Sequence, residues 1–249
     1  MNTVRLIDSL ASLPAKAKLA VVPALINAIE DPDPLVSAEA ATALGEIGPV
    51  DRYIVSTLLF ALGDKRNEVS LAAEEALKKI GSEAIPDLSD ILMCPHLVIR
   101  ANATYALEKI GSEDTVPALI TALHFDNNRV KMAAAYALGK IGVAAKDSVP
   151  ALKIILGNKD NGVKVAVAYA LSKIGVAAKE AVPDLILALE TTRSRGVRIA
   201  VSDALGDIGI DAIEAIPTLT KALSINETRT RTNEIVTQHI ETAIEKITR

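Results

Sequence analysis

Apolar residues recur along the chain at helical spacing, and this pattern repeats itself every 30 to 34 residues. Each copy closes with an Ile-Gly dipeptide, and the glycines are Gly48, Gly81, Gly111, Gly142, Gly175 and Gly209. A seventh copy ends with Lys246-Ile247-Thr248, where threonine replaces the glycine. Self-similarity at such a period predicts a repeat architecture instead of a single thick core.

Each copy contains two segments with the spacing of an amphipathic helix. The first has a proline two residues before a leucine, because proline is tolerated in the first turn of a helix. These leucines are Leu25, Leu58, Leu88, Leu119, Leu152, Leu185 and Leu219, and Ser56 takes the place of the proline before Leu58. The second begins at a β-branched residue twelve positions before the glycine, and the glycine can end the helix in a left-handed conformation. These β-branched residues are Val36, Val69, Ile99, Val130, Val163, Val197 and Val236.

A helix pair with one apolar stripe per helix buries that stripe only by stacking on its neighbours. We therefore expect an all-α fold, an α-solenoid of about seven stacked pairs, as one domain over residues 1–249 that forms a right-handed superhelix. The predicted repeats span approximately 20–48, 49–81, 82–111, 112–142, 143–175, 176–209 and 210–249. Residues 1–19, with Leu6, Leu10 and Leu13, are interpreted as a capping half-repeat. At the other end, Gln238, His239, Glu241 and Glu245 fit a terminal helix that faces water.

The repeated pattern, seen in VPALITAL followed by VKMAAAYALGKIG, resembles the HEAT-like repeats of the phycobilisome-lyase type. The resemblance covers nearly the whole chain and implies the solenoid fold. It leaves the function open, because such repeats occur in bilin lyases, phycobilisome-related chaperones, deoxyhypusine hydroxylase, some DNA glycosylases and many scaffolds. In such proteins the variable stripe of the second helix lines the concave surface.

In the second helix, positions one, four, five, eight and twelve before the glycine are apolar or small, so we expect them to be packed. Positions two, six and ten vary and share a stripe, since residues four apart lie on one face of a helix. In the three middle copies this stripe carries tyrosine and lysine, and acidic residues such as Glu46 and Asp203 stand on both sides. The predicted partner-binding residues are Tyr105, Lys109, Arg129, Met132, Tyr136, Lys140, Val165, Tyr169 and Lys173. Alternatively, the tyrosines belong to the folding unit and cover their neighbours' alanines.

The leading hypothesis is a non-enzymatic interaction, scaffold or chaperone module. Tyrosine offers a large amphipathic ring and lysine a flexible cation, which suits an acidic and apolar, or helical, segment of another protein. One alternative is a bilin lyase subunit or a chaperone of tetrapyrrole proteins, with bilin rings on tyrosines and propionates on lysines. Nucleic-acid binding is the weakest alternative, because the net charge is −4 and tryptophan is absent.

The chemistry-bearing residues are sparse. The three histidines lie in different copies and none begins a His-Glu pair, which argues against the hydroxylase, and no metal motif is present. Cys94 and His96 are the only neighbouring thiol and imidazole, and we expect their apolar turn to pack on the next copy instead of catalysing a reaction. A basic row at Arg100, Lys131, Lys164 and Arg198 is interpreted as contacting the turns between helices.

One cysteine and no apparent signal peptide or membrane span predict a cytoplasmic protein. We also expect a bacterial source, no membrane binding and no cofactor, with bilin possible under the alternative function.

Overall fold

The computed structural model describes residues 14–94, 96–225 and 231–249, and within these ranges every regular element is helical. The chain divides into two compact units, residues 1–118 and 119–249. Seven pairs of α-helices follow one another along the described parts of the chain, as the sequence predicts. The boundary between the units falls within helix α8 (Val116–Leu123).

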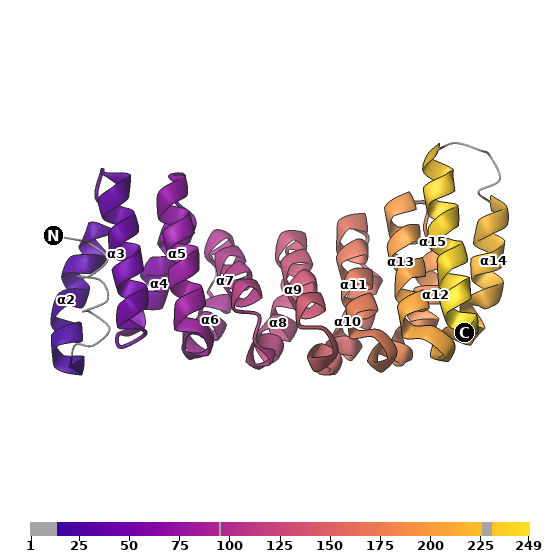
Figure 1. The fold of residues 1–249 in the computed structure, drawn as a ribbon, viewed down its shortest axis with the longest axis horizontal. Coiled ribbons are helices and arrows are strands. Elements are labelled where there is room, and N and C mark those ends of the chain that lie inside the picture. Colours follow the sequence, from indigo (N-terminus) through magenta and orange to yellow (C-terminus); the bar gives the residue numbers. More distant parts are fainter. Residues whose placement is uncertain (1–13, 95, 226–230) are drawn as a thin grey trace. The chain divides into compact units, whose positions relative to one another are not determined.

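In the N-terminal unit, α3 and α5 pack side by side, and α2, α4 and α6 form the second layer (Figure 1). The helices are α2 (Ala15–Ala28), α3 (Pro34–Ile47), α4 (Arg52–Leu62), α5 (Asn67–Ile80), α6 (Ile85–Leu92) and α7 (Leu97–Ile110). Two 3₁₀ segments, η1 (Gly81–Ala84) and η2 (Glu113–Thr115), connect one pair to the next.

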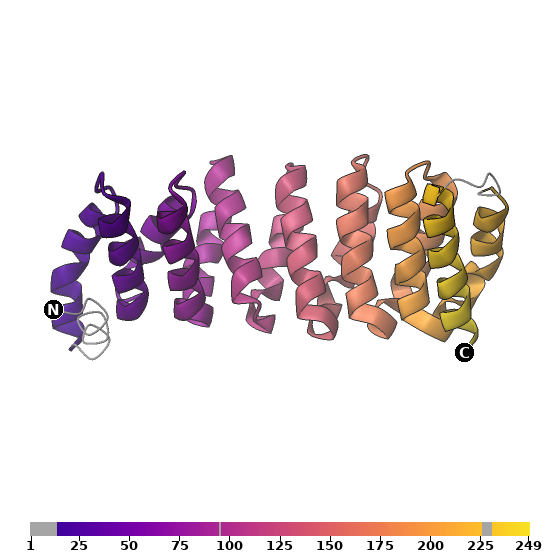
Figure 2. The ribbon, with the colours of Figure 1, turned by 45° about the horizontal axis from the view of Figure 1, so that its top comes forward.

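In the C-terminal unit, α9, α11, α13 and α15 lie side by side, and α10, α12 and α14 form the layer behind them (Figure 1, Figure 2). The helices are α9 (Asn128–Ile141), α10 (Val149–Leu156), α11 (Asn161–Ile174), α12 (Val182–Thr191), α13 (Arg195–Ile208), α14 (Ile216–Ile225) and α15 (Arg231–Thr248). The 3₁₀ segments between pairs are η3 (Gly142–Ser148), η4 (Gly175–Ala181) and η5 (Gly209–Ala215).

Burial follows the predicted positions of the repeat. The alanines five before each closing glycine and the leucines four before it are fully or almost fully buried, so the thin core is made of small and branched residues. Two of the β-branched residues at the start of the second helix depart from the prediction. Val36 and Ile99 are 39% and 37% exposed, whereas the other five are buried.

All six closing glycines have positive φ, as predicted, but only Gly111 adopts the left-handed helical conformation, with φ 63° and ψ 14°. Gly142 and Gly175 instead combine positive φ with ψ of −136°. This region is almost restricted to glycine, and here it leads the chain directly into the following 3₁₀ segment.

The two ends of the chain differ from the prediction. Helix α2 begins at Ala15 and contains Pro23, whereas the pattern predicts a helix that starts at this proline. Pro14 occupies the N-cap, and the helix forms because Ala17 and Lys18 donate backbone hydrogen bonds to its carbonyl. Leu6, Leu10 and Leu13 lie outside the described residues. At the other end, Glu241 and Glu245 are exposed on α15, as expected for a terminal helix.

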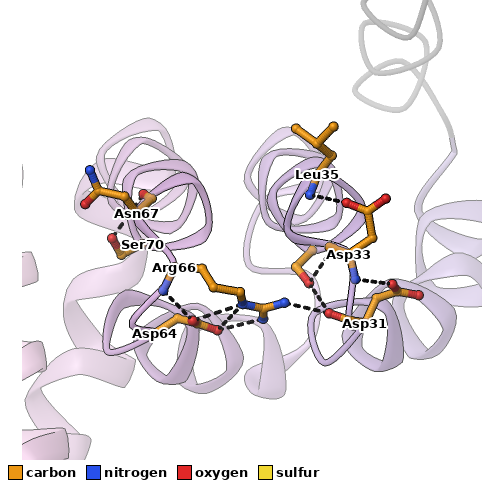
Figure 3. A network of polar contacts seen from close by, with 8 residues as sticks. Asp31, Asp33, Leu35, Asp64, Arg66, Asn67 and Ser70 are labelled. Atoms are coloured by element: carbon orange, nitrogen blue, oxygen red, sulfur yellow. Dashed lines mark hydrogen bonds and ion pairs between the residues drawn. The ribbon is translucent and has the colours of Figure 1, made fainter.

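One arginine ties two successive inter-helix turns together (Figure 3). Nη1 of Arg66 donates a 2.6 Å hydrogen bond to the carbonyl oxygen of Asp31, and Nη2 forms a 2.7 Å ion pair with Asp64. The hydrogen bonds from the Arg66 side chain and backbone lower the pKa of Asp64 to about 2. Arg66 lies fifteen positions before its closing glycine, Gly81, whereas the predicted basic row lies eleven positions before the glycine of each repeat. The contact of that row with the turns stays a prediction.

Candidate functional site

An open groove of about 610 Å³ runs across α9, α11, α13 and α15 of the C-terminal unit. On α11, α13 and α15, the residues two, six and ten positions before the end of the repeat all line this groove, and these are the positions of the variable stripe in the sequence. The lining residues are Tyr136, Val165, Tyr169, Ser172, Lys173, Gly196, Ile199, Ala200, Asp203, Asp207, Gln238, His239, Thr242 and Lys246. Four of the predicted site residues, Tyr136, Val165, Tyr169 and Lys173, therefore lie in one groove.

The two tyrosines form one side of this groove. The ring centroids of Tyr136 and Tyr169 are 5.4 Å apart, and the ring planes are tilted by 55°, a favourable arrangement for an aromatic pair. The Tyr169 ring also rests on α9 at Gly139, where a Cβ atom would lie only 2.7 Å from its Cε1. Both rings are half-buried, so each one packs against the solenoid and still presents a face to the groove.

The acidic residues of the groove are paired with side chains of the last helix. Nδ1 of His239 lies 2.7 Å from Oδ1 of Asp203. Asp207 accepts a 2.5 Å hydrogen bond from Ser172 and forms a 2.7 Å ion pair with Lys246. The sequence places both aspartates on the stripe but does not identify these partners. His239 and Lys246 thus complete the groove, in addition to belonging to the terminal helix.

Lys173 is the exception among the charged groups of the groove. Its Nζ lies 5.6 Å from the centre of the Tyr169 ring, close enough for a cation–π interaction. Among the described residues it has no hydrogen-bond or ion-pair partner for this ammonium group. The groove thus combines a mostly apolar side, formed by Val165 and Ile199 with the tyrosines, and one uncompensated positive charge.

Three other predicted residues of this unit do not line the groove. Met132 packs beside Gly162 of the next helix, since a Cβ built at that glycine would lie 3.2 Å from the methionine Sδ. Arg129 and Lys140 are exposed on α9. The assignment of these three residues to a binding site stays a prediction.

The remaining predicted pair, Tyr105 and Lys109, lies in the N-terminal unit and is engaged within it. The Tyr105 hydroxyl donates a 2.7 Å hydrogen bond to Glu74 of α5, and Nζ of Lys109 lies 2.8 Å from the other oxygen of the same carboxylate. Nζ of Lys109 also lies 4.8 Å from the Tyr105 ring centre. The arrangement braces α5 against α7, and a continuous ladder from Tyr105 to Tyr169 stays a prediction.

The hydrogen bonds among Glu74, Lys109 and Tyr105 favour the charged forms of Glu74 and Lys109. Partial burial of Glu74 disfavours its charged form, but the hydrogen bonds from Lys109 and Tyr105 outweigh that effect and leave the pKa of Glu74 below its ordinary value. The hydrogen bond to Glu74 raises the pKa of Lys109, with a smaller contribution from Tyr105. Lys109 is therefore held by its own chain, in contrast to Lys173.

The apolar residues around Cys94 are largely exposed, whereas the sequence predicts that they pack against the next repeat. Met93 is 69% exposed and the neighbouring Leu97 and Val98 are also exposed, while Cys94 is half-buried.

No group of three or more metal-ligating side chains occurs within residues 14–94, 96–225 and 231–249. The described helices are each too short or too polar to cross a membrane.

Paired helices stacked in two layers define an α-solenoid repeat protein. The chain belongs to the HEAT-repeat family, because HEAT repeats match residues 4–78, 22–108 and 85–172. None of the curated proteins compared with the chain matches it. The predicted resemblance to HEAT-like repeats is confirmed by this match.

Solved structures with the same fold include complexes between proteins. A chain of the CpcE–CpcF complex of phycocyanin lyase from Nostoc is 21% identical, with a TM-score of 0.53 over 62% of this chain and 99% of that one. A chain of the complex of Kap95p with RanGDP is 15% identical, with a TM-score of 0.61 over 93% of this chain and 37% of that one. An engineered protein is 23% identical, with a TM-score of 0.55 over 91% and 96% of the two chains. The similarity to a phycocyanin lyase chain is thus one of fold.

Proposed function

We propose that this protein is a non-enzymatic interaction module that binds a segment of another protein in the groove across α9, α11, α13 and α15. The observation that carries the proposal is the composition of the groove. Apolar surface is offered by Tyr136, Tyr169, Val165 and Ile199, and Lys173 offers a cation with no hydrogen-bond or ion-pair partner among the described residues. An acidic and apolar segment complements both features.

Two further observations support a protein partner. HEAT repeats are protein-interaction scaffolds, and the chain belongs to this family. Two of the structures that share its fold were solved as complexes, CpcE with CpcF and Kap95p with RanGDP. A groove shared by four helices also gives a partner contacts with several repeats at once, as extended solenoid surfaces do.

The alternative function is that the same groove binds a bilin. A bilin carries two propionates, and the groove offers one uncompensated cation, because Lys246 is already paired with Asp207. The carboxylates of Asp203 and Asp207 would repel a second propionate. The charges of the groove therefore favour a protein segment over a dicarboxylate pigment.

The test is a selection of random 16-residue peptides displayed on phage against the full chain. The selected peptides are then measured by fluorescence anisotropy against the wild type and Gly196→Phe. Gly196 lines the groove and has room for a Cβ, whose nearest neighbour would be 3.8 Å away on Val165. The added ring should fill the groove and weaken peptide binding at least tenfold.

The matched control is Thr220→Phe, which adds the same ring to an exposed position of α14 outside the groove. It should leave peptide affinity within threefold of the wild type, and circular dichroism should show equal helicity for all three proteins. If no selected peptide distinguishes the two variants, the proposed function is wrong. A visible spectrum recorded with added bilin decides the alternative, since binding would change the absorption of the pigment.

A further inference from the structure

The groove has two apolar positions one repeat apart and, on one flank, the ammonium group of Lys173, which has no hydrogen-bond or ion-pair partner among the described residues. Resting on the function proposed above, we infer that its occupant is an amphipathic α-helix of the partner protein. This helix carries two apolar residues seven positions apart, which contact Val165 and Ile199, and an acidic residue that pairs with Lys173. Three observations on the groove lead to this occupant.

The first observation is the spacing of the apolar positions. Val165 and Ile199 occupy equivalent positions on the adjacent helices α11 and α13. Packed helices lie about 8–10 Å apart. Seven residues of an α-helix rise by about 10.5 Å, so residues i and i+7 lie on one face at nearly this spacing. A β-strand repeats its face every two residues, or about 7 Å, and does not match the spacing.

The second observation is that both carboxylates of the groove, its strongest hydrogen-bond acceptors, are already engaged. Asp203 is bound by His239, and Asp207 is bound by both Ser172 and Lys246. An extended segment would bring unpaired backbone N–H and C=O groups that need partners in the groove. An α-helix satisfies its own backbone, so it requires only side-chain contacts. The groove is therefore better suited to a helix than to a strand.

The third observation is the place of Lys173. It follows Val165 by eight residues on α11, so the two Cα atoms are separated by about 12 Å along the helix axis. A partner helix is about 10–12 Å wide with its side chains. A helix that crosses α11 over Val165 therefore has one flank beside Lys173. An acidic residue on that flank, within one turn of the first apolar residue, reaches the ammonium group, which lies above the Tyr169 ring.

The experiment uses peptides selected on the full chain and compares them with a second selection on Lys173→Glu. The peptides selected on the wild-type protein should share two apolar residues seven positions apart and one acidic residue. A proline placed between the two apolar residues should abolish binding, because it breaks the helix. Lys173→Glu should weaken these peptides at least tenfold, and an acidic-to-lysine change in the peptide should restore affinity to that variant. The second selection should yield lysine or arginine at the same position.

Lys179→Glu is the matched control, since Lys179 is exposed on η4 and does not line the groove. It should change affinity less than threefold, and Lys173→Gln provides a second variant that removes the charge without reversing it. This inference is wrong if the peptides lose affinity for Gly196→Phe but bind both Lys173 variants as tightly as the wild type, or if they still bind with the proline in place. Either result leaves the proposed function standing. A selection without groove-dependent peptides overturns both.

Discussion

The ring of Tyr169 lies on the backbone of the neighbouring helix at Gly139, where a Cβ atom would be 2.7 Å from the ring. Gly139 is fully enclosed, and the Cα of Ala170 would lie 3.1 Å from the same Cβ. The absence of a side chain at residue 139 therefore lets α11 approach α9 and lets the tyrosine ring lie against α9 beside Tyr136. One glycine thus sets both the packing of two repeats and the shape of one side of the groove.

Gly139→Ala should destabilise the protein, although alanine is favoured over glycine within helices by about 1 kcal/mol. The new methyl group overpacks the interface, which costs about 1–3 kcal/mol, so thermal unfolding should occur at a lower temperature. In a Tyr169→Ala background the same change should cost less, because the ring is gone and only Ala170 remains close. Gly196→Ala is the control and should leave the unfolding temperature unchanged or slightly raised. Equal effects of Gly139→Ala in both backgrounds would contradict the packing described here.

Lys246→Ala should alter the groove more than the fold. It removes an exposed ion pair worth about 0–1 kcal/mol and leaves the charge of Asp207 uncompensated. Affinity for an acidic groove-binding peptide should therefore fall, by anisotropy, while the unfolding temperature changes little. Lys79→Ala removes the equivalent pair with Glu46 in the N-terminal unit and should leave peptide affinity unchanged. A similar loss of affinity in both variants would show that the effect is not local to the groove.

Asp64 should make part of the stability dependent on acidic pH. Its pKa is lowered from 3.8 to about 2 in the folded chain, chiefly by the side-chain hydrogen bond from Arg66. A carboxyl group with a depressed folded pKa contributes stability that is fully present above pH 4 and is lost as the pH falls towards 2. The difference in unfolding temperature between the wild type and Asp64→Asn should therefore shrink over this range. A difference that stays constant from pH 5 to pH 2 would rule out this contribution.

The closing glycines should differ in their tolerance of a side chain. Gly175 has φ 65° and ψ −136°, a region that costs other residues about 1–3 kcal/mol. Gly111 lies in the left-handed helical region, which asparagine adopts with little strain. Gly175→Asn should therefore lower the unfolding temperature by several degrees, whereas Gly111→Asn should change it much less. Equal losses at the two positions would contradict this distinction.

Tyr105 and Tyr136 should respond differently to loss of the hydroxyl group. Tyr105→Phe removes a hydrogen bond to the charged Glu74, and such bonds contribute about 1.5–3 kcal/mol when sheltered and less when partly exposed, as here. Tyr136→Phe keeps the aromatic pair with Tyr169 and should be nearly neutral. Chemical denaturation of the two variants measures the difference. If Tyr136→Phe is the more destabilising change, the proposed roles of the two rings are wrong.

The repeat pattern predicted most of the architecture, because each packed position recurs in every copy and a two-helix unit has one way to bury its stripe. It failed at Val36 and Ile99, which are exposed, and at the start of α2, which begins at Ala15 instead of Pro23. The stripe also predicted four residues that line the groove. It did not separate Tyr169 from Tyr105, since both occupy the same position of their repeats and are followed by lysine four residues later.

The sequence by itself determined the fold class, the helix pairs, the closing glycines and the face on which variable residues gather, since all of these follow from local periodicity. Only the tertiary structure decided which charges remain available. Lys109 is bound by Glu74 and Lys246 by Asp207, whereas the Lys173 ammonium group has the Tyr169 ring beside it and no hydrogen-bond or ion-pair partner among the described residues. These two ion pairs join residues 35 and 39 positions apart, and their geometry depends on how closely neighbouring helices pack. A periodic sequence contains equivalent lysines, and the contacts between repeats make them different.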